Sequence, residues 1–384
     1  MVDASNYEYN FILYRETLVL SAISNDIIRR AMGVSRYRKT RLFLVKCSEE
    51  FCDHAKNYAT TYDLEIYMVK FLREVKEILL KEGIDNQMIV THTWPATLFS
   101  VVPIFQDRNL ILIEEVPPLF DRLPSKIRDQ GYLDRFLTTK AAIRMINSRY
   151  MKTVKAAKMY LSISDYEKIV LEKYYGLKPD GVVYEPLDDR YFEYTRSERK
   201  SLIIFGNPDR NAIRCIMNSV GTENIKEIIQ VNSSLNLLED FASGVKITEI
   251  HNYTFLEIQG LYRRAALSIT DESRGSFELT PIESIMSGVP IISPAVPSIQ
   301  IIKERINSSK PQSEGETYPY FDYLKLRYGC DNGKVLKELA SWYSGIQSLR
   351  ELFSRMCHEL FSIDAVGIDF IRKVEQHFSY VSEK

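Results

Sequence analysis

Short apolar runs alternate with longer helical patterns along the whole chain, and this alternation limits the folds that are open to it. The strand-like runs in the first half lie at residues 11–14, 41–46, 87–91, 110–114, 159–164 and 181–185. Those in the second half lie at 201–206, 227–231, 245–250, 266–270 and 289–293, with a weaker turn-rich region near Tyr328-Gly329. The pattern predicts an α/β protein built on parallel sheets.

Two helical segments stand out between and after these runs. In residues 64–83 apolar side chains recur at three- and four-residue spacing, and Gly83 stands where a C-terminal cap belongs. Residues 345–378 are helical in pattern almost throughout, with an interruption at 362–367. We therefore expect a helix at 64–83 and a long, broken helical segment near the end of the sequence.

The length of the chain favours two domains. A sequence of 384 residues with 45% apolar residues can bury more than one core. Residues 193–201 are polar, charged and without apolar periodicity, as expected of a linker, and the alternating pattern restarts after them.

Charge and cysteine content restrict partners and compartment. The formal net charge is −1, which gives the whole molecule no nucleic-acid footprint. The five cysteines are scattered, without a CxxC pair or a histidine at metal-ligand spacing, and are expected to be thiols in a reducing compartment. The polar N-terminus has no signal-peptide core, and no apolar run is long enough to span a membrane. These features predict a cytoplasmic protein that could still contact a membrane surface peripherally, without spanning it.

One local charge feature departs from this balance. Residues 29–46 contain basic side chains and no acidic one: Arg29, Arg30, Arg36, Arg38, Lys39, Arg41 and Lys46. The run is either a solvated loop beside a strand, or a peripheral contact with an anionic membrane or a lipid-phosphate-linked acceptor. A single short cluster on a neutral protein is thin support for nucleic-acid binding.

The segment at residues 271–293 has the composition of a ligand-binding loop followed by a helix and a strand. Ligands bind open parallel sheets at the carboxyl ends of strands, and this segment follows the strand at 266–270. A helix that opens near Thr280-Pro281 presents free N–H groups to an anion such as a diphosphate, and Gly275 and Ser276 allow close approach. Glu283, one turn inside the helix, is placed to accept hydrogen bonds from a ribose diol. Alternatively it only complements the helix dipole.

The same segment resembles the donor-site signature of GT-B glycosyltransferases, especially glycosyltransferase family 4, whose pattern runs roughly E-G-F-G-L-x-x-x-E-A-M-A-x-G-x-P-V-I. Residues 275–279 (GSFEL) fall on E-G-F-G-L, Glu283 on the second glutamate, and residues 285–292 on the remainder. The resemblance implies that Glu283 holds the ribose of a nucleotide sugar. It also implies that the backbone at 276–280, which includes Phe277, Leu279 and Thr280, holds the diphosphate.

The chain departs from the family pattern at two places. Gly275 replaces the first glutamate, which contacts the transferred sugar in the family, so Glu278 or Glu272 would have to supply that carboxylate. In the loop after the strand at 201–206, Gly206 is present, but Asn207 replaces the usual arginine and the family's lysine is missing. Arg210 or Arg214 could supply the cation for the leaving diphosphate, or each could be a solvated surface residue.

Further matches in the same order extend the resemblance over roughly residues 155–380. Residues 156–192 resemble the family's bridge between domains, with Pro186, Asp188 and Phe192 on its P-x-D-x-x-x-F pattern. His251 and Asn252 occupy the loop that contacts the nucleobase in the family, although either could cap the next helix. Residues 357–378 resemble the segment in which the chain crosses back to the first domain.

The first 150 residues match the family only in pattern. His92 stands at the carboxyl end of a strand, where it is either catalytic or a hydrogen-bonding core residue. Glu114 and Glu115 stand where the family commonly has a histidine near the sugar. A carboxylate there could orient a sugar hydroxyl or stabilise positive charge at the anomeric carbon, or it could be a surface acid before the Pro-Pro turn.

The resemblance thus implies an α/β protein of GT-B fold, with two doubly wound Rossmann-like domains facing a central cleft. Residues 1–195 would bind the acceptor, residues 196–360 the nucleotide sugar, and residues 361–384 would form a helix that crosses back to the first domain. The implied activity is transfer of a hexose from a UDP or GDP sugar to an acceptor hydroxyl of a glycan, lipid-linked saccharide or small molecule. It would proceed with retention of anomeric configuration, without a metal or bound cofactor. One alternative is a degenerate GT-B protein that binds a nucleotide sugar or a partner without turnover. A sugar-phosphate epimerase is a third, although no acid–base set can be assembled for it.

Overall fold

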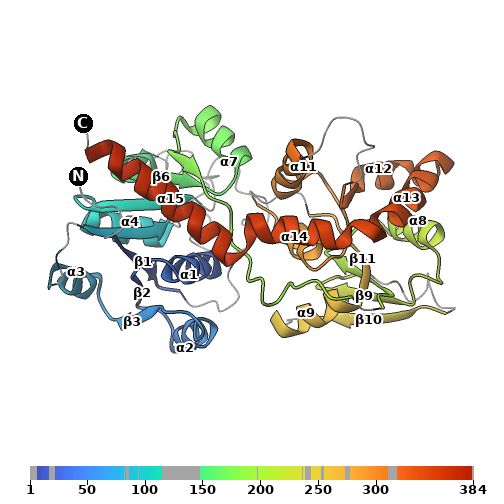
Figure 1. The fold of residues 1–384 in the computed structure, drawn as a ribbon, viewed down its shortest axis with the longest axis horizontal. Helices are drawn as coiled ribbons and strands as arrows, with labels where there is room; N and C mark the ends of the chain where they lie inside the picture. Colours follow the sequence, from blue (N-terminus) through green and yellow to red (C-terminus); the bar gives the residue numbers. More distant parts are fainter. Residues whose placement is uncertain are drawn as a thin grey trace, which may run out of the picture. The chain divides into compact units, whose positions relative to one another are not determined.

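A computed structural model describes residues 7–16, 22–81, 83, 86–93, 95–114, 148–196, 198–235, 237, 244–251, 255–272, 277–309 and 318–382. The chain divides into two compact units, each with one parallel β-sheet and its own helices (Figure 1). The first unit comprises Met1–Pro186 and Ile363–Lys384, and the second comprises Leu187–Ser362. The predicted α/β class with parallel sheets is therefore confirmed.

The first unit is built on a sheet with the strand order β3-β2-β1-β4-β5-β6-β7, in which every neighbouring pair is parallel. Its strands are β1 (Glu8–Tyr14), β2 (Thr40–Val45), β3 (Glu65–Val69), β4 (Gln87–His92), β5 (Asn109–Glu114), β6 (Met159–Ser162) and β7 (Gly181–Val182). The central strands are almost wholly buried, which explains why they read as continuous apolar runs rather than as alternating ones.

Helices cover this sheet. They are α1 (Ala22–Ser35), α2 (Glu49–Tyr58), α3 (Leu72–Lys81), α4 (Pro95–Phe105), α7 (Asp165–Val170), which continues as one π turn (Leu171–Tyr175), and α15 (Ile363–Ser382). Helix α15 lies beside α1 (Figure 1). A Cβ on Gly33 would lie 2.3 Å from the carbonyl oxygen of Ile363, and one on Gly367 would lie 2.6 Å from the carbonyl carbon of Gly33. Glycine at both positions therefore lets the two helix backbones meet.

The predicted helix at residues 64–83 is wrong in its first third. Residues 65–69 form strand β3, which pairs with β2 from Arg41–Glu65 to Val45–Val69, and helix α3 begins only at Leu72. The sequence Glu-Ile-Tyr-Met-Val is rich in residues that favour strands, and pairing to a buried neighbour outweighs the three- and four-residue spacing.

The second unit is built on a parallel sheet with the order β10-β9-β8-β11-β12-β13. Its strands are β8 (Ser201–Phe205), β9 (Glu227–Val231), β10 (Lys246–Ile250), β11 (Ala265–Thr270), β12 (Ile291–Ser293) and β13 (Tyr320–Asp322). Its helices are α8 (Arg210–Val220), α9 (Phe255–Arg264), α10 (Leu279–Met286), α11 (Pro297–Ser309), α12 (Tyr323–Gly329), α13 (Gly333–Ile346), a 3-10 turn (Gln347–Leu349) and α14 (Arg350–Phe361). In each sheet the first strand lies in the interior, and later strands are added first on one side of it and then on the other, as in a doubly wound fold.

Two details of the second half differ from the sequence interpretation. The weak strand expected near Tyr328-Gly329 is wrong, because residues 323–329 form helix α12 and the edge strand lies just before them at Tyr320–Asp322. Residues 187–195, assigned from sequence to the first domain, lie in the second compact unit. There the Phe192 ring meets that of Tyr262 at 5.9 Å, and Gln259 donates to the backbone carbonyl of Arg190 at 3.0 Å.

The expectation of five free thiols is also wrong. Cys215 on α8 and Cys330, next to the end of α12, form a disulfide with a Cα–Cα distance of 5.9 Å. The two cysteines are 115 residues apart, so their pairing follows from the fold and not from their spacing. Cys47, Cys52 and Cys357 are free thiols.

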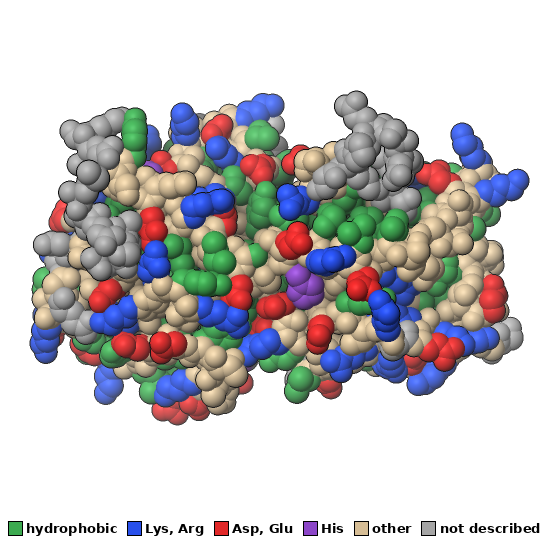
Figure 2. All heavy atoms as spheres, viewed as in Figure 1, with side chains coloured by type: hydrophobic (Ala, Val, Ile, Leu, Met, Phe, Trp, Pro, Cys, Tyr) green, Lys and Arg blue, Asp and Glu red, His purple; other side chains and the backbone are tan. Residues whose placement is uncertain are grey.

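The basic run at residues 29–46 does not form a continuous exposed surface. Three of its members are buried in the first unit. Arg30 pairs with Asp26 at 2.5 Å, Arg41 pairs with Glu8 at 2.8 Å, and Arg29 donates to the Tyr58 hydroxyl. Arg36, Arg38 and Lys39 each meet a carboxylate, on Asp364, Glu375 and Glu8 respectively. Figure 2 likewise shows basic and acidic side chains interspersed over the visible face. None of the helices in the described residues is both long enough and apolar enough to cross a bilayer.

Candidate functional site

The parallel register of the second sheet brings several sequence-predicted residues to one edge. Phe205, Val231, Ile250 and Thr270 end strands β8, β9, β10 and β11 and are paired with one another across the sheet. The loops that follow these strands therefore leave from the same edge. They carry Gly206 and Asn207, Asn232 and Ser233, His251, and Asp271 and Glu272.

The loop after β8 is held tightly against the loop after β11. Gly206 has a φ of +73°, and a Cβ there would lie 2.7 Å from Oδ1 of Asp271. The same oxygen accepts the backbone N–H of Asn207 at 3.2 Å. The side-chain oxygen of Asn207 accepts from the backbone N–H of Ser234 at 2.8 Å and from its hydroxyl at 2.9 Å. Asn207 thus joins the loops that follow β8, β9 and β11. The positive φ and the close approach of Asp271 require glycine at position 206.

Helix α8 begins directly after this loop. Asp209 caps it by accepting the N–H of Asn211 at 2.8 Å, and its own N–H donates to the Tyr323 hydroxyl at 2.9 Å. Arg210 is the first helical residue and is exposed, and Arg214 lies one turn later, also exposed. Of the two cations proposed from sequence, Arg210 is the nearer to the loop at Gly206.

Helix α10 begins at Leu279, just after the buried Phe277, whose ring meets that of Phe361 at 5.9 Å. Glu278 occupies the N-cap position in an extended conformation, but its side chain does not cap the helix within the described part of the chain. Leu279 and Thr280 are half-buried in the first turn, and Pro281 is the third helical residue. The first-turn N–H groups of such a helix suit an anion.

Glu283 lies one turn into α10 and is half-buried. The Tyr262 hydroxyl donates to its Oε2 at 3.4 Å, and the Tyr262 ring lies 6.0 Å from that of Phe205, the last residue of β8. A chain of contacts therefore links Glu283 to the end of β8 and the loop at Gly206. The ring of Tyr262 is buried, which fixes the direction of its hydroxyl.

Buried hydroxyl groups anchor α10 to the sheet. Oγ of Ser284 lies 2.6 Å from Oγ of Ser268 on β11 and donates to the carbonyl of Val289 at 2.9 Å. Ser354 on α14 donates to the carbonyl of Met286 at the other end of the helix. Gly288 ends the segment with a φ of +72°, and a Cβ there would lie 2.2 Å from the Tyr194 ring. The orientation of α10 is thus set by contacts on three sides.

The remaining predicted donor residues are placed less fully. His251 follows β10 and is exposed. Asn252, Gly275 and Ser276, like Glu115 in the first half, lie outside the residues that the structure describes. Their roles stay predictions, as do those of the residues above.

The carboxyl edge of the first sheet holds a buried hydrogen-bond network. Glu114 ends β5 and is fully buried. Its Oε1 accepts from the Thr93 hydroxyl at 2.6 Å, and its Oε2 accepts from the hydroxyls of Tyr150 and Tyr160. The alternative that Glu114 is a surface acid is therefore wrong.

His92 and Glu167 border this network. His92 ends β4, is fully buried, and has Nε2 3.5 Å from Oε1 of Glu16. Ser164 caps α7 by accepting the N–H of Glu167 at 3.0 Å, and the Glu167 carboxylate accepts the N–H of Ile163, one residue before the cap, at 2.9 Å. Burial, reinforced by the nearby charge of Glu114, raises the pKa of Glu167 well above its ordinary value. Burial and the same carboxylate also raise the pKa of Tyr150 and Tyr160.

Several of these positions were not predicted from sequence. Asp271 directly follows an apolar strand, so its position at the carboxyl edge of a sheet could be inferred from the sequence. Its hydrogen bond to the loop after β8 could not. Tyr262, Tyr150 and Tyr160 lie in helices or strands as ordinary aromatic residues. Only the packing of the sheet shows that their hydroxyls meet carboxylates.

This protein is similar to known proteins in its fold. No protein-family model matches the sequence, and no curated protein matches it either. Among solved structures, sucrose-phosphate synthase from Thermosynechococcus elongatus superposes with a TM-score of 0.62 at 11% identity, covering 97% of this chain and 100% of that one. HepE from Anabaena in complex with UDP gives 0.59 at 9% identity, covering 96% and 100%.

A third similar structure has a different activity. UDP-GlcNAc 2-epimerase from Neisseria meningitidis, bound to UDP-GlcNAc, superposes with a TM-score of 0.53 at 10% identity over 96% of this chain and 100% of that one. At such identities the comparisons establish architecture and leave activity to the site. The two parallel sheets, their strand orders and these superpositions identify the protein as a member of the GT-B fold, with two Rossmann-like α/β domains.

Proposed function

We propose that this protein is a glycosyltransferase that moves a hexose from a nucleoside-diphosphate sugar to an acceptor hydroxyl. Residues 196–360 would bind the donor and residues 1–195 the acceptor. The observation that carries the proposal is the position of Glu283 one turn into α10. Through Tyr262 and Phe205 it is linked to the glycine loop after β8. The similar architecture of the UDP-bound HepE and of sucrose-phosphate synthase supports it.

Each part of the edge has a chemical task in this proposal. The first-turn N–H groups of α10 and the guanidinium of Arg210 would face the diphosphate, and the carboxylate of Glu283 would accept both ribose hydroxyls. His251 would lie beside the base. Glu278 would replace the carboxylate that Gly275 does not supply, and would face the sugar.

The reaction would rest on stabilising the leaving group. As the acceptor oxygen bonds to the anomeric carbon, the bond from that carbon to the diphosphate oxygen breaks, and the hydroxyl proton passes to the departing diphosphate. Negative charge grows on the diphosphate, where fixed N–H dipoles and Arg210 would stabilise it most. This arrangement favours retention of configuration and needs no metal for the leaving group. A UDP or GDP sugar is the proposed donor, and a saccharide or lipid-linked saccharide the proposed acceptor.

Localisation belongs to the proposal too. We place the protein in the cytoplasm because nucleotide sugars are available there; the Cys215–Cys330 disulfide removes the cysteine content as an argument for a reducing compartment. The pairing of the basic run with neighbouring carboxylates removes most of the charge that a peripheral membrane contact would use. That run is therefore not part of the proposed acceptor site.

A binding protein without turnover is the alternative that one observation favours. Asn207 is neutral and its side-chain oxygen is bonded to Ser234, so the loop after β8 has no cation where the family has an arginine. Donor hydrolysis separates the two functions, because a transferase releases some free sugar and nucleoside diphosphate in the absence of acceptor, and a binder releases none. The epimerase alternative predicts conversion of UDP-GlcNAc into its 2-epimer.

The test of the donor site is a thermal-shift screen with UDP, GDP and ADP sugars on the full chain and on Glu283→Ala. A donor at about 100 times its Kd stabilises the folded state by about 2.7 kcal/mol. Loss of the carboxylate should weaken binding about tenfold or more, since hydrogen bonds to a charged group contribute roughly 1.5–3 kcal/mol. The melting temperature without ligand should change little.

Glu304→Ala is the matched control, because it removes an exposed carboxylate from α11 of the same unit. It should keep the full donor-dependent shift. If no nucleotide sugar stabilises the protein, or if Glu283→Ala responds like Glu304→Ala, the proposed donor site is wrong.

A further inference from the structure

The described residues line a hollow of about 680 Å³ on the first unit and one of about 610 Å³ on the second. The second combines aromatic and polar side chains in a way that indicates a ligand. It lies where helices α11 and α13 meet the edge strand β13, and none of its lining residues belongs to β8, α8, β11 or α10. It is therefore separate from the proposed donor site. Its volume falls within the roughly 300–1,000 Å³ that is usual for small-molecule sites.

The aromatic part of the hollow is held in place before any ligand arrives. Trp342 on α13 donates from Nε1 to the carbonyl of Tyr318 at 2.8 Å, and its ring lies 5.5 Å from that of Phe321. The Tyr318 hydroxyl donates to Asn307 at 2.9 Å, and its ring lies 5.7 Å from that of Tyr320. Nζ of Lys303 lies over the Tyr318 ring, 5.6 Å from its centroid, and so covers one face of that ring. The other aromatic faces carry a negative quadrupole that attracts polarised C–H groups.

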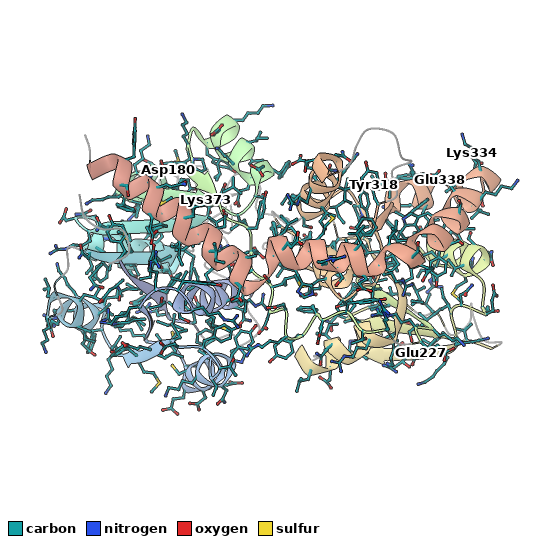
Figure 3. The ribbon with its side chains drawn as sticks, in the orientation of Figure 1. Asp180, Glu227, Tyr318, Lys334, Glu338 and Lys373 are labelled. Atoms are coloured by element: carbon teal, nitrogen blue, oxygen red, sulfur yellow. A yellow bond between two sulfur atoms is a disulfide. The ribbon has the colours of Figure 1, made fainter. Side chains whose placement is uncertain are left out.

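The polar part carries no net charge. Lys303 and Lys325 line the hollow together with Asp322 and Glu338, which gives two positive and two negative side chains. Lys325 and Glu338 pair across it at 2.9 Å, which leaves further donors on the ammonium and further lone pairs on the carboxylate. In Figure 3 Glu338 lies on α13. Gln300 and Ser341 add neutral donors and acceptors.

These features select among ligand classes. A nucleotide or another polyanion gains nothing from a site of zero net charge. A purely apolar molecule would leave the Gln300 amide and the remaining donors and lone pairs of the Lys325–Glu338 pair unsatisfied. A ligand with many hydroxyl groups and flat C–H faces satisfies both parts of the lining. We propose that this hollow is a binding site for a neutral saccharide of one to a few sugar residues.

This site goes beyond the proposed glycosyl transfer and does not depend on it. If the protein transfers sugars, the hollow would hold a saccharide chain away from the reacting groups and raise its local concentration. Its occupancy can be measured without any nucleotide sugar. Failure of saccharide binding and failure of donor binding at Glu283 are therefore separate results.

Trp342 gives a direct signal for the test. The chain has two tryptophans, so Trp94→Phe leaves Trp342 as the sole indole fluorophore. We would titrate this full-length variant with maltotetraose, cellotetraose and chitotetraose, and repeat the titrations by calorimetry on the unmodified chain. At least one tetrasaccharide should give a saturable fluorescence change and the same Kd by both methods.

Two surface substitutions locate the binding without disturbing the packed rings. Glu338→Ala removes a lining carboxylate, and Ser341→Tyr fills the hollow, and both positions are exposed on α13. Each should weaken saccharide binding about tenfold or more, while the melting temperature stays near that of the unmodified chain. Lys334→Ala, on the same helix (Figure 3) but not in the lining, should bind normally.

Three results would overturn the inference. The first is the absence of a saturable response to every tetrasaccharide. The second is unchanged affinity in both Glu338→Ala and Ser341→Tyr. The third is a Trp342 response to UDP alone that these two substitutions abolish, which would assign the hollow to a nucleotide.

Discussion

The two parallel sheets have similar amino edges and different carboxyl edges. At the amino edge of the first sheet, Glu8 meets Arg41 at 2.8 Å and Gln87 at 2.8 Å. At the amino edge of the second, Glu227, which is labelled in Figure 3, meets Ser201 at 2.9 Å and Lys246 at 3.1 Å. In both sheets a carboxylate from one strand ties the beginnings of its neighbours together.

At the carboxyl edges the likeness ends. In the first sheet Glu114 is fully buried and its two oxygens accept three side-chain hydroxyls, and the neighbouring His92 is fully buried as well. In the second sheet Asn207, Arg210, His251 and Glu272 are exposed, and Glu283 is half-buried. The first edge is stabilised by the protein's own groups, whereas the second presents polar groups to solvent. A doubly wound sheet thus does not make a ligand site by topology alone, and the side chains decide which edge is used.

The largest expected effect tests whether the edge at Glu114 is structural. Glu114→Ala would leave the hydroxyls of Thr93, Tyr150 and Tyr160 without their buried acceptor. We expect a loss of at least about 3 kcal/mol in the free energy of unfolding of the first unit, since each of the three unsatisfied hydroxyls costs roughly 1–3 kcal/mol. Urea denaturation, followed by hydrogen exchange of β4, β5 and β6, would measure it.

Glu114→Gln is the control for this prediction. The amide keeps the size and one acceptor oxygen, so most of the stability should return. If Glu114→Ala unfolds at the same urea concentration as the unmodified chain, the network does not stabilise the first unit. A role of Glu114 in sugar binding would then become the better explanation of its position.

The next effect concerns the second unit, where the Cys215–Cys330 disulfide ties α8 to the end of α12. Replacing both cysteines with serine should lower the free energy of unfolding by about 2–4 kcal/mol, because the closed loop of 115 residues no longer restricts the unfolded chain. Denaturation of the unmodified chain with and without reductant should show the same difference. The double variant should not respond to reductant, and hydrogen exchange in the first unit should be unchanged. Titration of five free thiols in the folded, untreated protein would contradict the disulfide.

A smaller effect tests the exposed edge of the second sheet. Gly206→Ala places a methyl group 2.7 Å from Asp271 at a φ of +73°, so Asp271 must move and its bond to Asn207 must break. We expect about 1–2 kcal/mol lower stability and weaker donor binding. Gly244→Ala is a matched control, since its φ is +98° but no described atom lies within 4 Å of the added Cβ. It should lose stability without losing donor affinity, and equal donor affinity in both variants would remove the β8 loop from the site.

Most of the fold could be predicted from the sequence because buried parallel strands are locally distinct. The runs at 227–231 and 266–270 end where β9 and β11 end, and the run at 201–206 ends one residue after β8. The alternation of strands and helices fixes which loops share an edge. The errors lie where local pattern and tertiary pairing disagree. Apolar side chains at residues 65–69 recur at helical spacing, but this segment pairs with β2 and forms a strand. The strand Tyr320–Asp322 is too short to show a periodicity in the sequence.

The site was less predictable for a different physical reason. Glu283 could be placed one turn into a helix from Pro281 and Gly288 alone. Tyr262 and Asp271 could not be given their partners, because hydrogen bonds between segments 21 and 64 residues apart depend on packing. For the same reason Arg29, Arg30 and Arg41 looked like an exposed cluster, although tertiary contacts bury them.

The smallest effect concerns the amino edges of the two sheets, where a carboxylate makes equivalent contacts. Burial alone would raise the pKa of Glu227, but hydrogen bonds from Lys246, Ser201 and Thr248 outweigh it and lower the pKa. The pKa of Glu8 is lowered in the same way by Gln87, Arg41 and Lys39. A carboxylate with a lowered folded-state pKa stabilises the fold above its ordinary value of 4.5, and this stabilisation is lost as the pH falls through the folded-state pKa.

Glu227→Gln and Glu8→Gln should therefore each lower the free energy of unfolding by about 0.5–1 kcal/mol at pH 7, and by progressively less as the pH falls below 4.5. Urea midpoints between pH 3 and 7 would measure both. Glu167→Gln should show the opposite trend, because burial raises the pKa of Glu167 and the folded state disfavours its charge as the pH rises. If Glu227→Gln followed the trend of Glu167→Gln, the amino edge of the second sheet would be strained by its carboxylate. The likeness between the two amino edges would then be one of geometry without a shared energetic role.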